Sequence, residues 1–150
     1  MGGDIANWIK AFANLPVRPV MSLRGGNAAD DSEPVPSYEP ALDTVTPVYL
    51  ETYFFGLAQL DSASWRFYLP HFLSYALENV GNTASNAIES FLFSLRPPDR
   101  DPPRFGALSY EQRQAVVSVL DQLAFSDHSA WKEPAIIALE EYWAPGATYR

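Results

Sequence analysis

Apolar residues recur at intervals of three and four along most of the chain behind residue 46, the spacing of one face of an α-helix. Thr46-Pro47 offers an N-cap followed by proline at the first helical position, where the missing N–H costs nothing. Ser109 and Gln112 have the spacing of a capping box. The pattern predicts helices over residues 47–60, 64–81, 83–95, 109–123 and 129–143.

Proline interrupts this pattern at two places. Within the second predicted helix, Pro70 removes a hydrogen bond from the helix interior, so we expect the helix to start near Ser64-Trp65 or to restart at Pro70. Between the third and fourth helices, residues 96–104 contain four prolines and alternate Arg with Asp. This composition predicts a stiff surface segment that connects the third predicted helix to the fourth.

The first third of the chain has a different character. Apolar residues between Asp4 and Pro16 predict one short amphipathic helix. Residues 16–45 are rich in proline and polar residues and include Gly25-Gly26, so no regular element fits and a long loop is expected. The chain therefore divides into an N-terminal helix with a Pro-rich acidic loop, 1–45, and a helical bundle domain, 46–150. The predicted fold is all-α, an irregular bundle of five or six helices.

Composition narrows the chemistry. The 150 residues contain no cysteine, which excludes disulfides and thiolate metal sites. The formal charge of −8 opposes direct binding to nucleic acid and favours partners with basic surfaces. No apolar run approaches the roughly 20 residues that a membrane span needs. Because the N-terminus also lacks the basic region of a signal peptide, we expect a cytoplasmic protein without membrane contact.

The negative charge is unevenly distributed. From Asp30 to Glu51 there are six acidic residues and no Lys or Arg. This pattern fits either a solvated surface that maintains solubility or a face that contacts a partner. The candidate partner-binding residues are Asp30, Asp31, Glu33, Tyr38, Glu39, Asp43, Glu140, Glu141 and Tyr142.

No arrangement of side chains predicts a catalytic site. The only histidines are His71 and His128, and His128 lies in one turn with Ser126 and Asp127, where adjacent residues cannot face one another as a catalytic triad. Neither histidine follows a glutamate by three residues, as a di-iron bundle requires. We therefore expect no catalytic residue, no cofactor and no metal ion.

One pair of charges lies in strongly apolar segments. Glu89 stands between Ile88 and Phe91, and Arg66 belongs to an equally aromatic segment. A structural ion pair between Arg66 and Glu89 is the favoured interpretation, since buried charges usually persist by pairing. A catalytic acid at Glu89 is the alternative.

The sequence Trp65-Arg66-Phe67-Tyr68-Leu69-Pro70, together with residues 89–95 and 138–143, resembles a group of small, acidic bacterial proteins of uncharacterised function. The likeness covers residues 47–145. Such proteins are similar to immunity proteins encoded beside secreted antibacterial toxins, including those of type VI secretion. The resemblance carries no catalytic residue.

These observations together suggest a binding protein. We expect an immunity protein that neutralises a cognate, cytoplasm-acting toxin with a basic surface, for example a nuclease effector, through electrostatic complementarity. Two alternatives remain open at this point: a small helical enzyme with a carboxylate and arginine site, and a regulatory scaffold protein.

Overall fold

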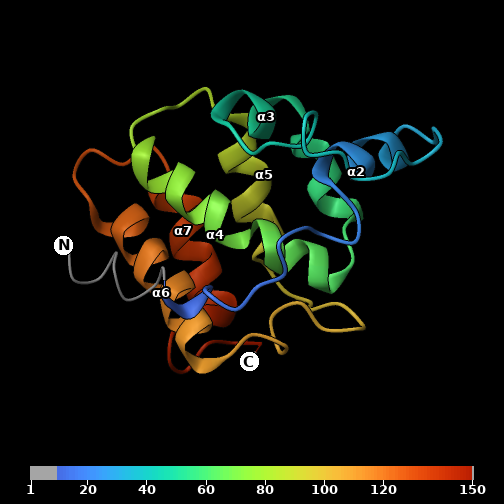
Figure 1. Ribbon diagram of the computed structural model, residues 1–150. Coiled ribbons are helices and arrows are strands. Elements are labelled where there is room, and N and C mark those ends of the chain that lie inside the picture. The colour runs from blue at the N-terminus through green and yellow to red at the C-terminus, as the bar shows by residue number, and fades with distance from the viewer. Residues whose placement is uncertain (1–9, 150) are drawn as a thin grey trace.

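The computed structural model describes residues 10–149, and over that range the chain is helical with no strand (Figure 1). This confirms the all-α prediction. The short helix predicted between Asp4 and Pro16 lies partly outside the described residues. The elements are α2 (Leu23–Asp30), α3 (Pro47–Thr52), the 3₁₀ helix η1 (Phe54–Gln59), α4 (Ser62–Glu78), α5 (Asn86–Ser94), α6 (Tyr110–Phe125), α7 (Lys132–Ala138) and the π-helical turn η2 (Leu139–Trp143).

Capping side chains fix several helix starts where the sequence indicated them. The Thr46 hydroxyl accepts a hydrogen bond from the Tyr49 N–H at 3.1 Å, and Pro47 occupies the first helical position. At the start of α6, Ser109 and Gln112 each accept from the other's backbone N–H, which completes the capping box. Both predicted starts are confirmed.

The longest helix, α4, forms the centre of the bundle, and α5 and α6 lie on either side of it in Figure 1. Trp65, Tyr68 and Phe72 of α4 are at most 1 % exposed. Phe72 stacks on Phe91 of α5, with ring centroids 5.2 Å apart. The core is therefore built on aromatic side chains of α4.

Of the two expected starts, the one near Ser64-Trp65 agrees with the observed start at Ser62 to within two residues. The restart at Pro70 is wrong, because α4 continues through this residue to Glu78. A proline inside a helix costs about 3 kcal/mol through its missing N–H and its clash with the preceding turn. Burying a single large apolar side chain contributes about 1.5–3 kcal/mol. The burial of several aromatic side chains along α4 offsets the local cost of Pro70.

The predicted long loop is also wrong in part, because residues 23–30 form α2. Leu23 is fully buried, and α2 packs closely against η1. The contact is between backbones: a Cβ atom added to Gly26 would lie 2.4 Å from the carbonyl oxygen of Gly56. Gly25-Gly26, which locally favours a loop, instead permits two helices to approach without side chains between them.

Within residues 10–149, no helix combines the length and the apolar character that crossing a bilayer requires.

Candidate partner-binding surface

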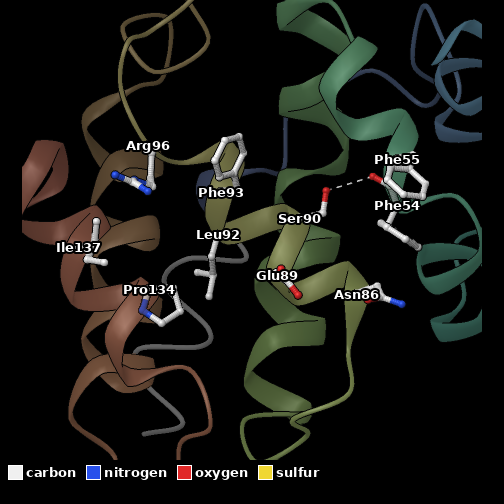
Figure 2. A pocket seen from close by; sticks show the side chains of 10 residues that line it. All are labelled: Phe54, Phe55, Asn86, Glu89, Ser90, Leu92, Phe93, Arg96, Pro134 and Ile137. Atoms are coloured by element: carbon white, nitrogen blue, oxygen red, sulfur yellow. Dashed lines mark hydrogen bonds between the residues drawn. The ribbon is translucent and has the colours of Figure 1, made fainter.

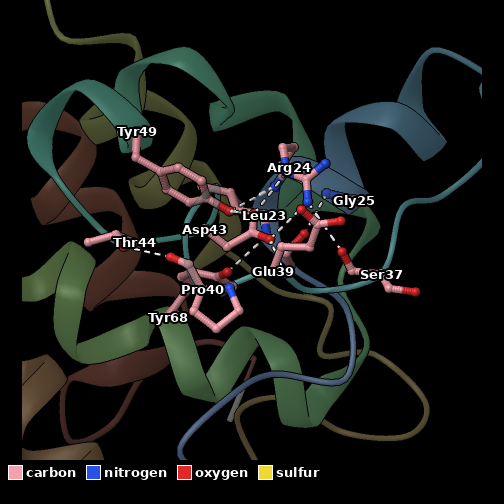
Figure 3. Close-up of polar contacts among 11 residues, drawn as sticks. Leu23, Arg24, Gly25, Ser37, Glu39, Pro40, Asp43, Thr44, Tyr49 and Tyr68 are labelled. Carbon is pink, nitrogen blue, oxygen red and sulfur yellow. Dashed lines mark hydrogen bonds and ion pairs between the residues drawn. The ribbon is translucent and has the colours of Figure 1, made fainter.

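The segment after α2 is fastened to the bundle by an ion pair between Arg24 and Asp43 (Figure 3). Arg24 Nε donates to Asp43 Oδ1 at 3.1 Å, and Nη2 donates to Oδ2 at 3.0 Å. Asp43 is only 1 % exposed. The prediction that Asp43 belongs to a partner-binding surface is therefore wrong, because its buried carboxylate is hydrogen-bonded within the protein.

Two tyrosines complete this buried network. The Tyr49 hydroxyl donates to Asp43 Oδ1 at 2.7 Å and accepts from the Arg24 N–H at 3.1 Å. The Tyr68 hydroxyl of α4 accepts from the Leu23 N–H at 3.0 Å. Burial raises the pKa of Asp43, but the hydrogen bonds from Arg24, Glu39 and Tyr49 outweigh it and hold the pKa below its ordinary value. The network anchors α2 and fixes the path of the chain behind it.

The remaining acidic residues of this region face solvent. Asp30, Asp31, Glu33 and Glu39 are exposed, and we call residues 30–39 the acidic segment. Val35 within this segment is 49 % exposed. Tyr38 is half-buried, with the Arg18 guanidinium 5.9 Å from its ring centroid. The acidic segment thus combines negative charge with accessible apolar surface.

A groove of about 460 Å³ lies between η1, α5 and α7 (Figure 2). Phe54 and Phe55 of η1 form one side, Pro134 and Ile137 of α7 form the other, and Phe93 lies near the C-terminal end of α5. We call it the aromatic groove. Two of its phenylalanines are strongly exposed, Phe55 at 59 % and Phe93 at 73 %.

The acidic segment and the aromatic groove meet at η1. Gln59, the last residue of η1, donates from Nε2 to Asp30 Oδ1 at 3.2 Å, so the C-terminal end of α2 lies against the helix that forms one side of the groove. The element that supplies Phe54 and Phe55 to the groove therefore also contacts Asp30, where the acidic segment begins.

Polar groups within the groove do not form an acid–base site. The Ser90 hydroxyl donates to the Phe54 carbonyl at 3.2 Å, and Arg96 is held by Glu141 in a two-fold contact at 2.6 and 3.0 Å. Glu89 is exposed on the groove and has no basic side chain within ion-pair distance among the described residues.

The predicted ion pair between Arg66 and Glu89 is wrong. Arg66 is half-buried, and no contact within 4 Å joins it to Glu89. Helix α5 buries Ile88, Phe91 and Leu92, which share one face. Residue 89 falls outside that face, so Glu89 points to water instead of into the core.

The other predicted partner-binding residues, Glu140, Glu141 and Tyr142, lie in or next to η2. Glu140 is exposed, Glu141 is engaged by Arg96, and Tyr142 packs against Phe105 with ring centroids 5.0 Å apart. In Figure 1 the segment after α2 runs along the right side of the view, whereas α7, which leads into η2, overlaps α4 left of centre. The structure does not bring Glu140 and Glu141 together with the acidic segment.

Sequence reasoning missed a second carboxylate that the fold engages, the half-buried Glu51. Glu51 accepts hydrogen bonds from the Tyr75 hydroxyl at 2.6 Å, the Ser85 hydroxyl at 2.5 Å and the Ala87 N–H at 3.0 Å. Burial raises the pKa of Glu51, but these hydrogen bonds outweigh it and lower the pKa overall. Glu51 caps α5, since Ser85 and Ala87 surround the first turn. Nothing in the local sequence distinguishes Glu51 from the other acids near it.

Among residues 10–149, no three His, Asp or Glu side chains are grouped so that they could hold a metal ion.

Comparison with known proteins identifies the family of this chain, but the function of that family is unknown. The model of DUF6714, a family of unknown function, matches residues 1–147, and the chain belongs to this family. No curated protein and no solved structure matches the chain.

Proposed function

We propose that this member of DUF6714 binds a basic protein and neutralises it, as an immunity protein neutralises its cognate toxin. The observation that carries the proposal is the aromatic groove, where Phe55 and Phe93 remain 59 % and 73 % exposed. Exposed aromatic clusters are characteristic of protein interfaces, because each ring buries a large apolar area when a partner docks.

The charge of the protein selects the class of partner. With a formal charge of −8, the chain attracts basic surfaces at long range and repels acidic ones. Asp30, where the acidic segment begins, contacts Gln59 of η1, and η1 also supplies Phe54 and Phe55 to the groove, so the charge of this segment adds to the attraction of a basic partner. Toxins that act on nucleic acids have basic substrate clefts, and such a cleft complements this surface.

The rigidity of the surface supports tight binding. Because the buried ion pair of Arg24 with Asp43 fixes the chain next to the acidic segment, less conformational entropy is lost on association. An immunity protein requires slow dissociation, which preorganised apolar anchors provide.

The test is co-expression with candidate basic toxins taken from the reading frames next to this gene. The wild-type protein should rescue growth, and the double variant Phe55→Ala/Phe93→Ala should bind the toxin at least tenfold more weakly and rescue poorly at equal abundance. Phe125→Ala is the matched control, since Phe125 is 70 % exposed on α6, outside the groove. Unchanged affinity of the double variant would exclude the aromatic groove as the binding site.

A further inference from the structure

The loop between α5 and α6 is organised by one of its own carboxylates. Asp99 Oδ1 accepts from the N–H groups of Arg100, Arg104 and Phe105 at 2.8–2.9 Å, and Oδ2 accepts from that of Gly106 at 2.9 Å. Burial raises the pKa of Asp99, but these four backbone hydrogen bonds lower it further than burial raises it. The loop therefore has a defined shape that positions its arginine side chains.

Three arginines of this loop line one cavity of about 490 Å³. They are Arg96, Arg100 and Arg104, from a chain with only ten Lys and Arg residues and a net charge of −8. Asp99 lines the same cavity, but its oxygens are occupied by backbone N–H groups. The cavity is thus a local concentration of positive charge on an acidic protein.

The charge of Arg104 is buried without a carboxylate partner. Its side chain is 3 % exposed, and no Asp or Glu among residues 10–149 lies within 4 Å of its guanidinium. Nη2 donates to the carbonyls of Leu57 and Leu60, whereas the buried Nε has no acceptor. The Trp65 ring centroid is 5.7 Å away and provides a further, weaker stabilisation of the cation.

Arg100 adds a second positive charge that no carboxylate pairs with among the described residues. It is exposed, its Nη1 donates to the Ala58 carbonyl at 2.6 Å, and within the described part of the chain it makes no ion pair. Burial and the nearby positive charge of Arg100 lower the pKa of Arg104 to about 10. Arg96 differs from both, because Glu141 already neutralises it.

Apolar side chains border the arginines. Phe93, which is 73 % exposed, lines this cavity as well as the aromatic groove, and Pro97 and Phe105 add to its lining. A ligand here meets guanidinium groups and an exposed aromatic ring within one cavity.

We propose that this cavity binds a small organic anion, whose carboxylate or phosphate is held by Arg100 and Arg104 and whose apolar body lies against Phe93. A guanidinium matches either anionic group through parallel N–H donors. A bound anion would place a negative charge closer to Arg104 than Asp61 and Asp99, whose carboxylates lie beyond ion-pair distance and raise its pKa only in part. The cavity shares Phe93 with the aromatic groove, but Arg100 and Arg104 line the cavity alone, so the binding of a small anion to the isolated chain is tested separately from the protein partner.

Isothermal titration calorimetry of the full-length protein at fixed ionic strength tests the site with four probes: phenyl phosphate, benzoate, inorganic phosphate and neutral benzamide. We expect phenyl phosphate or benzoate to bind at least tenfold more tightly than inorganic phosphate, and benzamide not to bind. The stronger of the two aromatic anions identifies the anionic group. Binding of benzamide as tight as that of benzoate would overturn the proposal, and so would the absence of binding by both aromatic anions at millimolar concentration.

The variant Arg100→Gln should weaken the binding of the better probe at least tenfold, since Arg100 is exposed and its replacement leaves the core intact. Arg66→Gln is the matched control, because it removes the same charge from α4, outside the cavity. Arg104→Gln removes a buried side chain, so its folding is first checked by circular dichroism, and Phe93→Ala provides a second variant that retains the arginines. Equal affinity of wild type and Arg100→Gln contradicts the site, whether or not Arg104→Gln folds.

Discussion

Gly56 lies so close to Leu23 that a Cβ atom on Gly56 would be 2.2 Å from the Leu23 carbonyl oxygen. Helix α2 and η1 therefore meet at backbone distance, and a side chain at this position has no space. This contact attaches α2 to the bundle, together with the ion pair of Arg24 with Asp43 and the hydrogen bond from the Leu23 N–H to the Tyr68 hydroxyl.

Gly56→Ala should accordingly destabilise the protein by about 3 kcal/mol, the upper end of the cost of overpacking, because a backbone must move to admit the methyl group. Urea denaturation followed by circular dichroism measures the change. Gly81→Ala is the control, since its Cβ would be 3.5 Å from the nearest atom and the residue is exposed. Equal stability of both variants would contradict the close contact of α2 with η1.

Asp43→Ala should destabilise by roughly 3 kcal/mol, because it leaves the Arg24 guanidinium and the Tyr49 hydroxyl without their shared acceptor. Glu39→Ala removes a neighbouring exposed carboxylate and should change the free energy of unfolding by less than about 0.5 kcal/mol. A cost for Glu39→Ala as large as that for Asp43→Ala would show that general charge, and not the buried pair, stabilises this region.

Stability should fall in two stages as the pH decreases. Burial lowers the pKa of His71, so the folded state binds this proton less well than the unfolded chain, and stability decreases below about pH 6.5. Asp43 and Glu51 have lowered pKa values when folded, so their contribution is complete above about pH 5 and is lost as the pH falls through those values.

Urea midpoints between pH 8 and pH 3 measure this profile. His71→Gln should remove the first stage, and Glu51→Gln should flatten the second. If the urea midpoint of the wild-type protein is constant from pH 8 to pH 4, His71 does not cause a first loss of stability.

Glu89→Ala should leave stability unchanged within about 0.5 kcal/mol, because Glu89 is exposed and unpaired by any arginine or lysine among the described residues. Four residues earlier, Ser85→Ala should cost about 1 kcal/mol or more, since Ser85 caps α5 and also donates to Glu51. Thermal unfolding of both variants provides the comparison. A loss of several kcal/mol for Glu89→Ala would restore the idea of a buried ion pair at that residue.

Reversal of three exposed charges, Asp30→Lys, Asp31→Lys and Glu33→Lys, should lower the association rate with a basic partner and weaken its dependence on salt. The matched control reverses Glu78, Glu111 and Asp127, which are also exposed, so the net charge changes equally. Stopped-flow association at two ionic strengths separates the two cases. If both triple variants slow association equally, net charge alone is responsible and the acidic segment has no special role.

The sequence by itself determined where α3 and α6 begin and most of the apolar residues that α4 and α5 bury. Thr46 and the pair Ser109–Gln112 act through contacts within one helical turn, so their capping is encoded locally. The periodic apolar residues of α4 and α5 likewise predicted the core that Phe72 and Phe91 form. The position of the aromatic groove could not be predicted, since it depends on how three separate elements pack.

Tertiary structure decided every feature in which a distant segment outweighs a local preference. Pro70 locally favours a break and Gly25-Gly26 locally favours a loop, but burial of α4 and the contact of α2 with η1 reverse both. Tertiary packing also decides which charged side chains form ion pairs. Arg24 reaches Asp43, and Arg66 does not reach Glu89, because side-chain direction depends on the rotation of each helix about its axis, which only packing sets.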